Sequence, residues 1–336
     1  MPARSMAWSI ALACLAALPA AAAPPSAAEL LGAAGYSPAE IARVESGELV
    51  EKALPSGSER ELVAAFAFLV ASTPDALLSE VRTGLVDRVD PNTVAFAMIP
   101  GPPTLADFAK LTLAPDPPKQ VRAYLAARPG GDLNLSSEEI AAFTALGADA
   151  QVPAVEQAVR GALLARLEAY QAKGLAGIAP YALAGGEQRS PADELRSATR
   201  AGTLLAKYAP AAQRMLLDYP GSRAPGSLET FRWTRYLAHG EPTVSLTHGL
   251  FVPDGDAWVV VQRQFYVSTG YNSEQAVGAL MPVEKGTVVF YVNRTSTDQV
   301  LGFGGSAKRS IGSKLLASQL QALYEKVRKA VPKAGG

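Results

Sequence analysis

Residues Thr243–Gly312 read TVSLTHGLFVPDGDAWVVVQRQFYVSTGYNSEQAVGALMPVEKGTVVFYVNRTSTDQVLGFGGSAKRSIG and hold most of the strand-forming sequence of this 336-residue chain. Short turns rich in Gly, Asp and Asn separate runs of alternating or apolar residues at 243–252, 257–268, 275–283 and 287–296. Strands joined by such short turns lie antiparallel beside one another. Together with a preceding run at 229–238, they predict a five-stranded antiparallel meander.

A long helix is predicted after the meander, from about Gly305 to Val331. Its apolar residues fall on one face and most of its bases lie opposite, which is typical of a helix that packs on a core. The apolar face consists of Leu316, Leu320, Leu323, Tyr324, Val327 and Val331.

Upstream of the meander, predicted helices alternate with short strands. Ser or Thr caps followed by Pro or an acid predict helices near 38–45, 74–83, 104–111, 137–146 and 191–206. A longer helix at 152–173 carries one apolar stripe, interpreted as a core contact, formed by Val155, Val159, Leu163 and Leu167. Strands are predicted at 48–54, 61–71 and 93–99, and we expect the first two to pair.

These elements predict an α+β fold, with a curved antiparallel sheet, a long C-terminal helix packed across it, and additional helices between the N-terminal strands and the meander. We expect one domain over 23–332, with an N-terminal mixed half at 23–190 and a C-terminal half at 191–332. The order of elements is that of the helix-grip, or START-like, architecture, in which sheet and final helix enclose a cavity. This similarity concerns the fold and does not by itself assign a function.

The N-terminus has the pattern of a secretory signal peptide. An apolar run at 10–18 precedes Ala20 and Ala22, two small residues that fit cleavage after Ala22. The run is shorter than the roughly 20 residues that span a bilayer. We therefore expect a periplasmic or secreted protein with a signal peptide over 1–22. Acylation of Cys14, the only cysteine, is a weaker alternative because it would truncate the apolar run.

The charge balance argues against a nucleic-acid binder, because the chain has 31 Lys and Arg against 31 Asp and Glu. Charge is nevertheless uneven along the chain. From Gly305 onward Glu325 is the only acid, against the bases Lys308, Arg309, Lys314, Lys326, Arg328, Lys329 and Lys333. The final helix could make a weak contact with an anionic membrane, or its bases could form a solvated face.

His248 is the first candidate site residue. On the strand 243–252 a period of two places its imidazole on the same face as Val244, Leu246 and Leu250. It is either a neutral core histidine bonded to a neighbouring strand or a group that contacts a ligand or transfers protons. His239 is expected in an exposed turn.

No recognisable motif names a reaction. With two histidines, no HExxH motif and no cysteine pair, the sequence predicts neither a metal site nor a cofactor. No GxSxG motif is present either, so the sequence assigns no catalytic residue and His248 is only a weak candidate for one.

The strand 257–268 carries polar residues on both faces. Gln262, Gln264 and Tyr266 share one face, and Arg263 lies on the other. If the face with Gln262, Gln264 and Tyr266 lines a cavity, these three residues are the polar contacts in that cavity. If that face is exposed to water, Arg263 is instead a charged residue on the buried face. The sequence leaves both alternatives open.

The last strand ends in the polar cluster Asn293–Asp298, and Asn293 is a further candidate for ligand contact. The following glycine-rich turn at 302–309 is either an anion-binding helix start or a flexible turn. Arg309 falls on the apolar side of the final helix and needs an acceptor. We predict that Asp298, or a backbone carbonyl near Asn293, supplies it and fastens the helix to the strand.

Several of these segments resemble a family of exported bacterial proteins with no assigned function. The resemblance rests on Val244–His248, Gln264–Ser268, Tyr291–Arg294 with Asp298, and Gly304–Arg309, with fainter similarity at 47–82 and 102–113. Relatives in that family carry two nearby cysteines where this chain has ARPGGD at 127–132. This chain lacks both cysteines, which suggests that in the relatives they form a disulfide the fold does not require, rather than a redox site. The resemblance implies no activity.

The sequence thus supports three hypotheses. The first is an exported binding protein with a cavity for an apolar or amphipathic small molecule such as a lipid, contacted by His248, Gln262, Gln264, Tyr266 and Asn293. The second is a hydrolase or isomerase that uses His248 with Asp298 or Tyr266. The third is an envelope-associated module that docks through the basic terminal helix.

Overall fold

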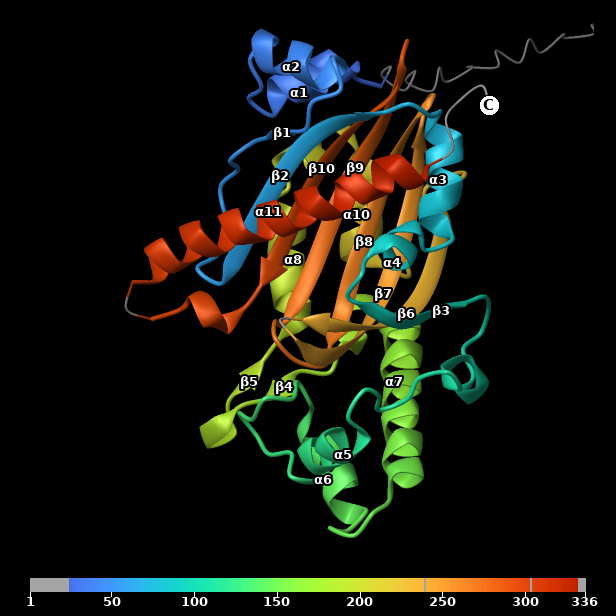
Figure 1. Ribbon diagram of the computed structural model, residues 1–336, viewed down its shortest axis with the longest axis vertical. Helices are drawn as coiled ribbons and strands as arrows, with labels where there is room; N and C mark the ends of the chain where they lie inside the picture. The colour runs from blue at the N-terminus through green and yellow to red at the C-terminus, as the bar shows by residue number, and fades with distance from the viewer. Residues whose placement is uncertain (1–23, 239, 303, 332–336) are drawn as a thin grey trace, which may run out of the picture.

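The computed structural model describes residues 24–238, 240–302 and 304–331. The predicted signal peptide, Cys14 and His239 lie outside these residues. Within the described part, an eight-stranded antiparallel sheet carries the C-terminal helix α11 (Gly305–Ala330) across one face, with further helices around it (Figure 1). The predicted α+β fold is therefore confirmed.

The predicted meander is confirmed as consecutive neighbours in the sheet: β6 (Leu228–Ala238), β7 (Glu241–Asp254), β8 (Ala257–Val267), β9 (Ser273–Val283) and β10 (Gly286–Ser296). The N-terminal strands extend both edges of the meander. β2 (Glu61–Val70) pairs with β10 and with the short β1 (Val50–Glu51), and β3 (Thr93–Ile99) pairs with β6. The sheet order is therefore β1-β2-β10-β9-β8-β7-β6-β3.

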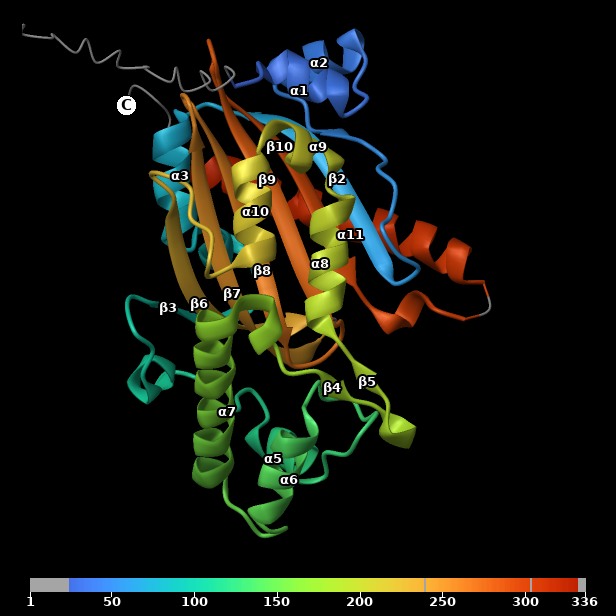
Figure 2. The ribbon, with the colours of Figure 1, turned by 180° about the vertical axis from the view of Figure 1, so that it is seen from behind.

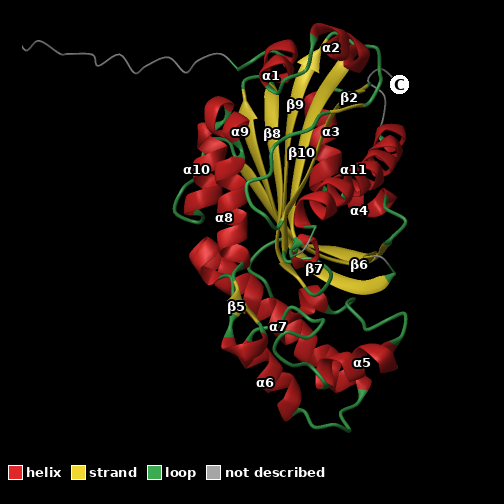
Figure 3. Cartoon of the chain, turned by 90° about the vertical axis from the view of Figure 1, so that its left-hand side faces the viewer, coloured by secondary structure: helices red, strands yellow, loops and turns green. Residues whose placement is uncertain are grey.

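One face of the sheet, which we call the α11 face, is covered by α11, α3 (Pro74–Arg82) and α4 (Leu85–Val89) (Figure 3). α11 crosses β2, where Val327 belongs to a buried apolar cluster with Phe66 and Phe68. The alternate residues of β2 face the opposite side, where Ala67 packs with residues of α1 (Ala27–Ala33) and α2 (Pro38–Glu45). β2 is thus buried on both faces, as its composition predicts.

The opposite face, which we call the α8 face, is covered by α8 (Pro191–Ala201), α9 (Thr203–Tyr208) and α10 (Pro210–Asp218) (Figure 2). The long helix α7 (Val152–Lys173) extends from the lower end of the sheet beside α5 (Pro117–Leu125) and α6 (Ser137–Ala145) (Figure 2). Its predicted stripe is in the core. Val155, Val159, Leu163 and Leu167 are each at most 3% exposed.

Short segments complete the chain: η1 (Leu105–Phe108), η2 (Gly174–Gly177), β4 (Tyr181–Ala182), η3 (Ala184–Gly186), β5 (Gln188–Arg189) and η4 (Asp298–Val300). No helix within the described ranges is long and apolar enough to cross a membrane.

Three predicted elements differ in extent. The predicted helix 104–111 is only the 3-10 turn η1: the carbonyl of Asp107, which would accept from the Leu111 amide in an α-helix, accepts from Trp233, and the Leu111 amide donates to Phe108. The predicted helix 191–206 is divided into α8 and α9 at Gly202, whose ψ of 70° is not helical. The predicted strand 48–54 keeps only the two residues of β1.

Candidate functional site

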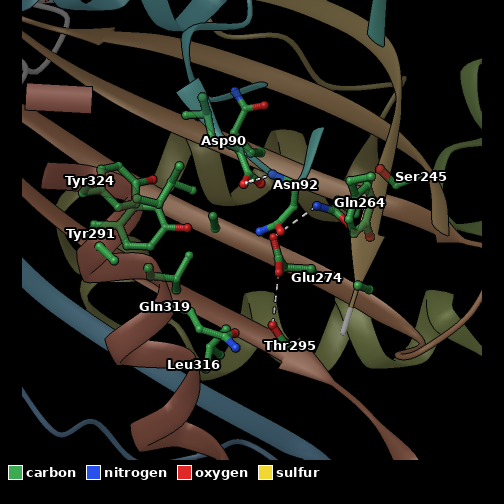
Figure 4. A pocket seen from close by; sticks show the side chains of 18 of the residues that line it. Asp90, Asn92, Ser245, Gln264, Glu274, Tyr291, Thr295, Leu316, Gln319 and Tyr324 are labelled. Atoms are coloured by element: carbon green, nitrogen blue, oxygen red, sulfur yellow. Dashed lines mark hydrogen bonds between the residues drawn. The ribbon is translucent and has the colours of Figure 1, made fainter. Parts of the chain in front are cut away.

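A cavity of about 940 Å³ lies between the α11 face of the sheet and α11, and we call it the sheet–helix cavity. Leu316, Leu320 and Leu323 of α11 line one wall, and residues of α3 and α4 line another. The floor consists of side chains from the meander strands (Figure 4). Pockets for small ligands commonly have volumes of about 300–1,000 Å³, so the sheet–helix cavity is large enough to hold one.

The floor changes from apolar to polar along the strands. Residues that are directly opposite in adjacent strands form rows across the sheet. One such row, the apolar row, consists of Phe251, Val260, Gly278 and Tyr291. Four residues further along each strand, another row, which we call the polar row, consists of Arg232, Thr247, Gln264, Glu274 and Thr295. All five residues of the polar row line the cavity.

Glu274 is the acceptor at the centre of the polar row. Gln264 Nε2 donates to one carboxylate oxygen at 3.3 Å, and the Thr295 hydroxyl lies 3.2 Å from the other. The Thr295 hydroxyl is also 2.8 Å from Asn293 Oδ1, so it can donate to either group. Burial raises the pKa of Glu274 above its ordinary value, while hydrogen bonds from Asn293 and Thr295 and the charge of Arg232 oppose this shift.

Tyrosines in the adjoining loop and strand orient the Gln264 amide. The Tyr271 hydroxyl donates to Gln264 Oε1 at 2.6 Å and lies 2.5 Å from the Tyr236 hydroxyl. With its oxygen held by Tyr271, the amide directs its nitrogen toward Glu274 (Figure 4). A chain of hydrogen bonds therefore runs from Tyr236 to Thr295 across the polar end of the cavity.

The guanidinium of Arg232 is engaged by other partners. Its Nε lies 3.0 Å from Asp87 Oδ2, and its Nη1 donates to Gln262 Oε1 at 2.5 Å. The second oxygen of Asp87 accepts from the Thr234 hydroxyl at 2.8 Å. Arg232 and Asp87 thus form a charge pair with its own hydrogen bonds, next to the Glu274 network, and Arg232 acts on Glu274 through its charge but not through a salt bridge.

The structure resolves the two alternatives for the strand 257–268. The face with Gln262 and Gln264 lines the sheet–helix cavity, and Arg263 is fully buried on the α8 face. Arg263 finds neutral acceptors there, in Gln275, Thr199 and the carbonyl of Leu216. Asn293 is also fully buried, and it reaches the network through Thr295 and Tyr291.

Tyr266 does not share a face with Gln264, contrary to the prediction. Leu246 is opposite Tyr266 and Thr247 is opposite Gln264, so Phe265 is an extra residue that forms a β-bulge. The bulge turns Phe265 onto the ring of Tyr170, at 4.0 Å between centroids, and places Tyr266 4.2 Å from the Arg166 guanidinium. Tyr266 therefore packs in the core around α7 and does not line the sheet–helix cavity.

His248 is a hydrogen-bonded histidine of the core on the α8 face. Its Nδ1 is 3.0 Å from the Tyr170 hydroxyl, its Nε2 is 3.2 Å from Glu229, and its ring stacks on Phe231. Burial lowers the pKa of His248 to about 4, although Glu229 favours the charged form. The imidazole is therefore neutral at pH 7, and it lines neither the sheet–helix cavity nor the smaller cavities of about 210 and 10 Å³.

The predicted pair between Arg309 and Asp298 is wrong. Arg309 Nη1 donates to the carbonyl of Glu59, whereas Asp298 binds Arg60 at 2.9 Å and Arg189 at 3.0 Å. α11 packs along β2, so its first turns reach the chain that enters β2 rather than the end of β10. Arg309 still fastens the helix, but to the segment that precedes β2, through the carbonyl of Glu59.

Sequence reasoning missed Glu274, Thr295 and the pair of Arg232 with Asp87. A signal for Glu274 is present, because a period of two places it on the face of Ala276, Gly278 and Leu280. An acid among small and apolar residues on one face of a strand indicates a polar group in a buried setting. The described part of the chain holds no cluster of His, Cys, Asp and Glu that could hold a metal ion.

Comparison of the sequence with protein-family models and curated proteins, and of the fold with solved structures, finds no significant match.

Proposed function

We propose that this protein is an exported binding protein that holds an amphipathic small molecule in the sheet–helix cavity. The observation that carries the proposal is the change from the apolar row to the polar row within one cavity. The apolar part of the ligand lies between α11 and the apolar row, and its polar group meets the polar row. Ligand sites are typically built in this way, with apolar linings and a few placed polar groups.

Two further observations support this function. The signal-peptide pattern at 1–22 is consistent with a periplasmic or secreted location. A sheet whose cavity is closed by the C-terminal helix is also what the START-like order of elements implies. The alternative of a hydrolase or isomerase using His248 has less support, because its imidazole and Tyr266 lie on the α8 face, away from the cavity.

The test uses Gly278, which lies in the apolar row and lines the cavity. A Cβ built at Gly278 has no neighbour closer than 3.8 Å, so a side chain there extends into the cavity without backbone strain. We expect native mass spectrometry of the protein isolated from its own host to show a co-purifying amphiphile at one per chain. Gly278→Phe should remove this adduct, and the matched control Gly278→Ala should retain it.

The proposal fails if the wild-type protein carries no adduct and also binds no amphiphile added in vitro. It also fails if folded Gly278→Phe protein, verified by near-UV circular dichroism, retains the wild-type adduct.

A second candidate function, compatible with the first, is contact between α11 and an anionic membrane. Ile311 and Leu315 are 68% and 53% exposed, and both lie at the mouth of the sheet–helix cavity. The exposed bases Lys308 and Lys314 flank them, and α11 contains no acid before Glu325. We propose that this surface docks on anionic lipid, where each base is worth about 1 kcal/mol.

Sedimentation with vesicles tests this contact. We expect the protein to bind phosphatidylglycerol vesicles, not phosphatidylcholine vesicles, and to be released by salt. Ile311→Ser with Leu315→Ser should abolish binding, and Val94→Ser should preserve it, because Val94 is an exposed apolar residue of β3. A lack of binding, or equal binding to both vesicles, would refute membrane docking by α11.

A further inference from the structure

The carboxylate of Glu274 has no cationic partner in the described part of the chain. Its neighbours Gln264 and Thr295 are neutral donors, and it takes part in no salt bridge there. Half-buried carboxylates are usually paired or protonated, because desolvation disfavours their charge. The centre of the polar row therefore combines an ionisable acid with space beside it and no counter-ion bonded to it; the charge of Arg232, in the same row, favours the ionised form without a salt bridge.

Among the described residues, the other charged side chains around the cavity do not form a salt bridge with Glu274. Arg232 is paired with Asp87, and Asp90 adds a further carboxylate at the same end of the cavity (Figure 4). Lys308 and Lys326 are exposed at the rim on α11, and the ammonium of Lys308 donates to the carbonyl of Leu301. The inner polar end thus contains three carboxylates and one guanidinium.

Four tyrosines line the same cavity as Glu274. Tyr236 and Tyr271 line the polar end, while Tyr291 and Tyr324, 4.7 Å apart between centroids, line the cavity toward the apolar row. Tyrosine faces attract cations through the ring quadrupole, and such rings beside a carboxylate are a recognised setting for ammonium groups. Hydrogen bonds occupy the tyrosine hydroxyls at the polar end.

Resting on the proposed binding function, we propose that the ligand is a cationic amphiphile, an amine or quaternary ammonium joined to an apolar group, with Glu274 as its counter-ion. The head group lies on the polar row between Glu274 and the tyrosine rings, and the apolar group extends under α11. A fatty acid or another anionic amphiphile would place its charge against Glu274 and Asp90, so the site discriminates against it. Binding is non-covalent and involves no proton or group transfer.

Three probes with the same twelve-carbon chain test this assignment: dodecyltrimethylammonium, dodecanoate and dodecanol. All are titrated calorimetrically at pH 7, the two ionic probes below their critical micelle concentrations and dodecanol below its solubility limit. For the wild-type protein we expect the ammonium probe to bind at least tenfold more tightly than dodecanoate. Glu274→Gln should weaken the ammonium probe at least tenfold and leave dodecanol unchanged. The matched control Glu284→Gln changes the same charge at the exposed turn that follows β9 and should behave as wild type.

A pH series separates a counter-ion from a structural role. The charge of the quaternary ammonium does not change with pH, so its affinity should fall with acidification as carboxylates at the polar end are protonated. Glu274→Gln should show a clearly smaller fall, since only Asp87 and Asp90 remain there. Equal or tighter binding of dodecanoate, or an unchanged ammonium affinity in folded Glu274→Gln protein, would overturn the assignment. If all three probes bind alike and Gly278→Phe abolishes binding, the binding function stands and the cationic head group is refuted. If none binds, the cationic head group is refuted, and the binding function fails with it only if the protein also carries no co-purifying adduct.

Discussion

Protonation of His248 should destabilise the fold in a defined pH range. Burial lowers the pKa of His248 from its ordinary 6.5 to about 4. As the pH falls below 6.5, the unfolded chain binds a proton that the folded chain does not accept until near pH 4. The contribution of His248 to the free energy of unfolding is therefore complete above pH 6.5 and is lost between pH 6.5 and 4. A shift of this size corresponds to about 3 kcal/mol in total, of which about 2 is lost between pH 7 and 4.5.

The measurement is urea unfolding, followed by tryptophan fluorescence at several values of pH from 7 to 4.5. His239 is first replaced by Gln in both proteins, so that the parent contains His248 as its only histidine. Glu194 also titrates at low pH and keeps its surroundings in His248→Gln, with which the parent is compared. The hydrogen bond from His248 lowers the pKa of Glu229, so the difference between the two proteins reports the pair of His248 and Glu229. We expect the parent to lose about 2 kcal/mol more than His248→Gln between pH 7 and 4.5. Parallel stability curves would show that His248 is not held neutral by burial.

Two further changes test the backbone and the cavity. Gly174→Ala should lower the free energy of unfolding by at least about 3 kcal/mol, because φ is 55° and the new Cβ would lie 1.8 Å from the carbonyl oxygen of Tyr219. Gly161→Ala in α7 should raise it by about 0.5–1 kcal/mol, because no atom lies within 4 Å of the new Cβ. Equal effects of the two substitutions in urea unfolding would contradict this geometry. Glu274→Gln should raise the Tm at pH 7 and leave it nearly unchanged near pH 4. Burial raises the pKa of Glu274, so its ionisation destabilises the folded state as the pH rises above 4.5, the ordinary pKa of a glutamate. A lower Tm of the variant at pH 7 would indicate that the carboxylate stabilises the fold.

The sheet was largely predictable, because alternation and short turns are local signals. The runs from Thr243 onward predict β7 to β10 within a few residues, and the Ala and Phe alternation at 61–71 predicts a strand buried on both faces. The early end of the predicted helix 104–111 was not predictable in the same way, because it depends on a hydrogen bond from a distant side chain to a backbone carbonyl. Nothing near Asp107 in the sequence indicates that Trp233, 126 residues later, would end its helix after one turn.

The candidate site was only partly predictable, because it depends on how strands align. Gln262 and Gln264 could be assigned to one face from the sequence, yet the step from Gln264 to Tyr266 crosses a bulge that no glycine marks. The stacking of Phe265 on Tyr170, whose helix is far away in the sequence, accounts for that bulge. Helical periodicity likewise gives the direction in which Arg309 points from α11. It does not give the segment that α11 packs against, and so it could not identify the carbonyl of Glu59 as the partner.

The bulge at Phe265 also connects the two faces of the sheet. It sets the register that brings Thr247 opposite Gln264, and hence completes the polar row between Arg232 and Glu274. In β8 and β9, the residues that alternate with the cavity-lining residues belong to the core of the α8 face. Arg263 and Gln275 form a hydrogen bond there. β8 thus carries residues that line the cavity and residues of the α8-face core on alternate positions up to the bulge. Substitutions one position apart in β8 should therefore separate the two roles: Gln264 variants should alter ligand discrimination with little loss of stability, and Arg263 variants should alter stability first.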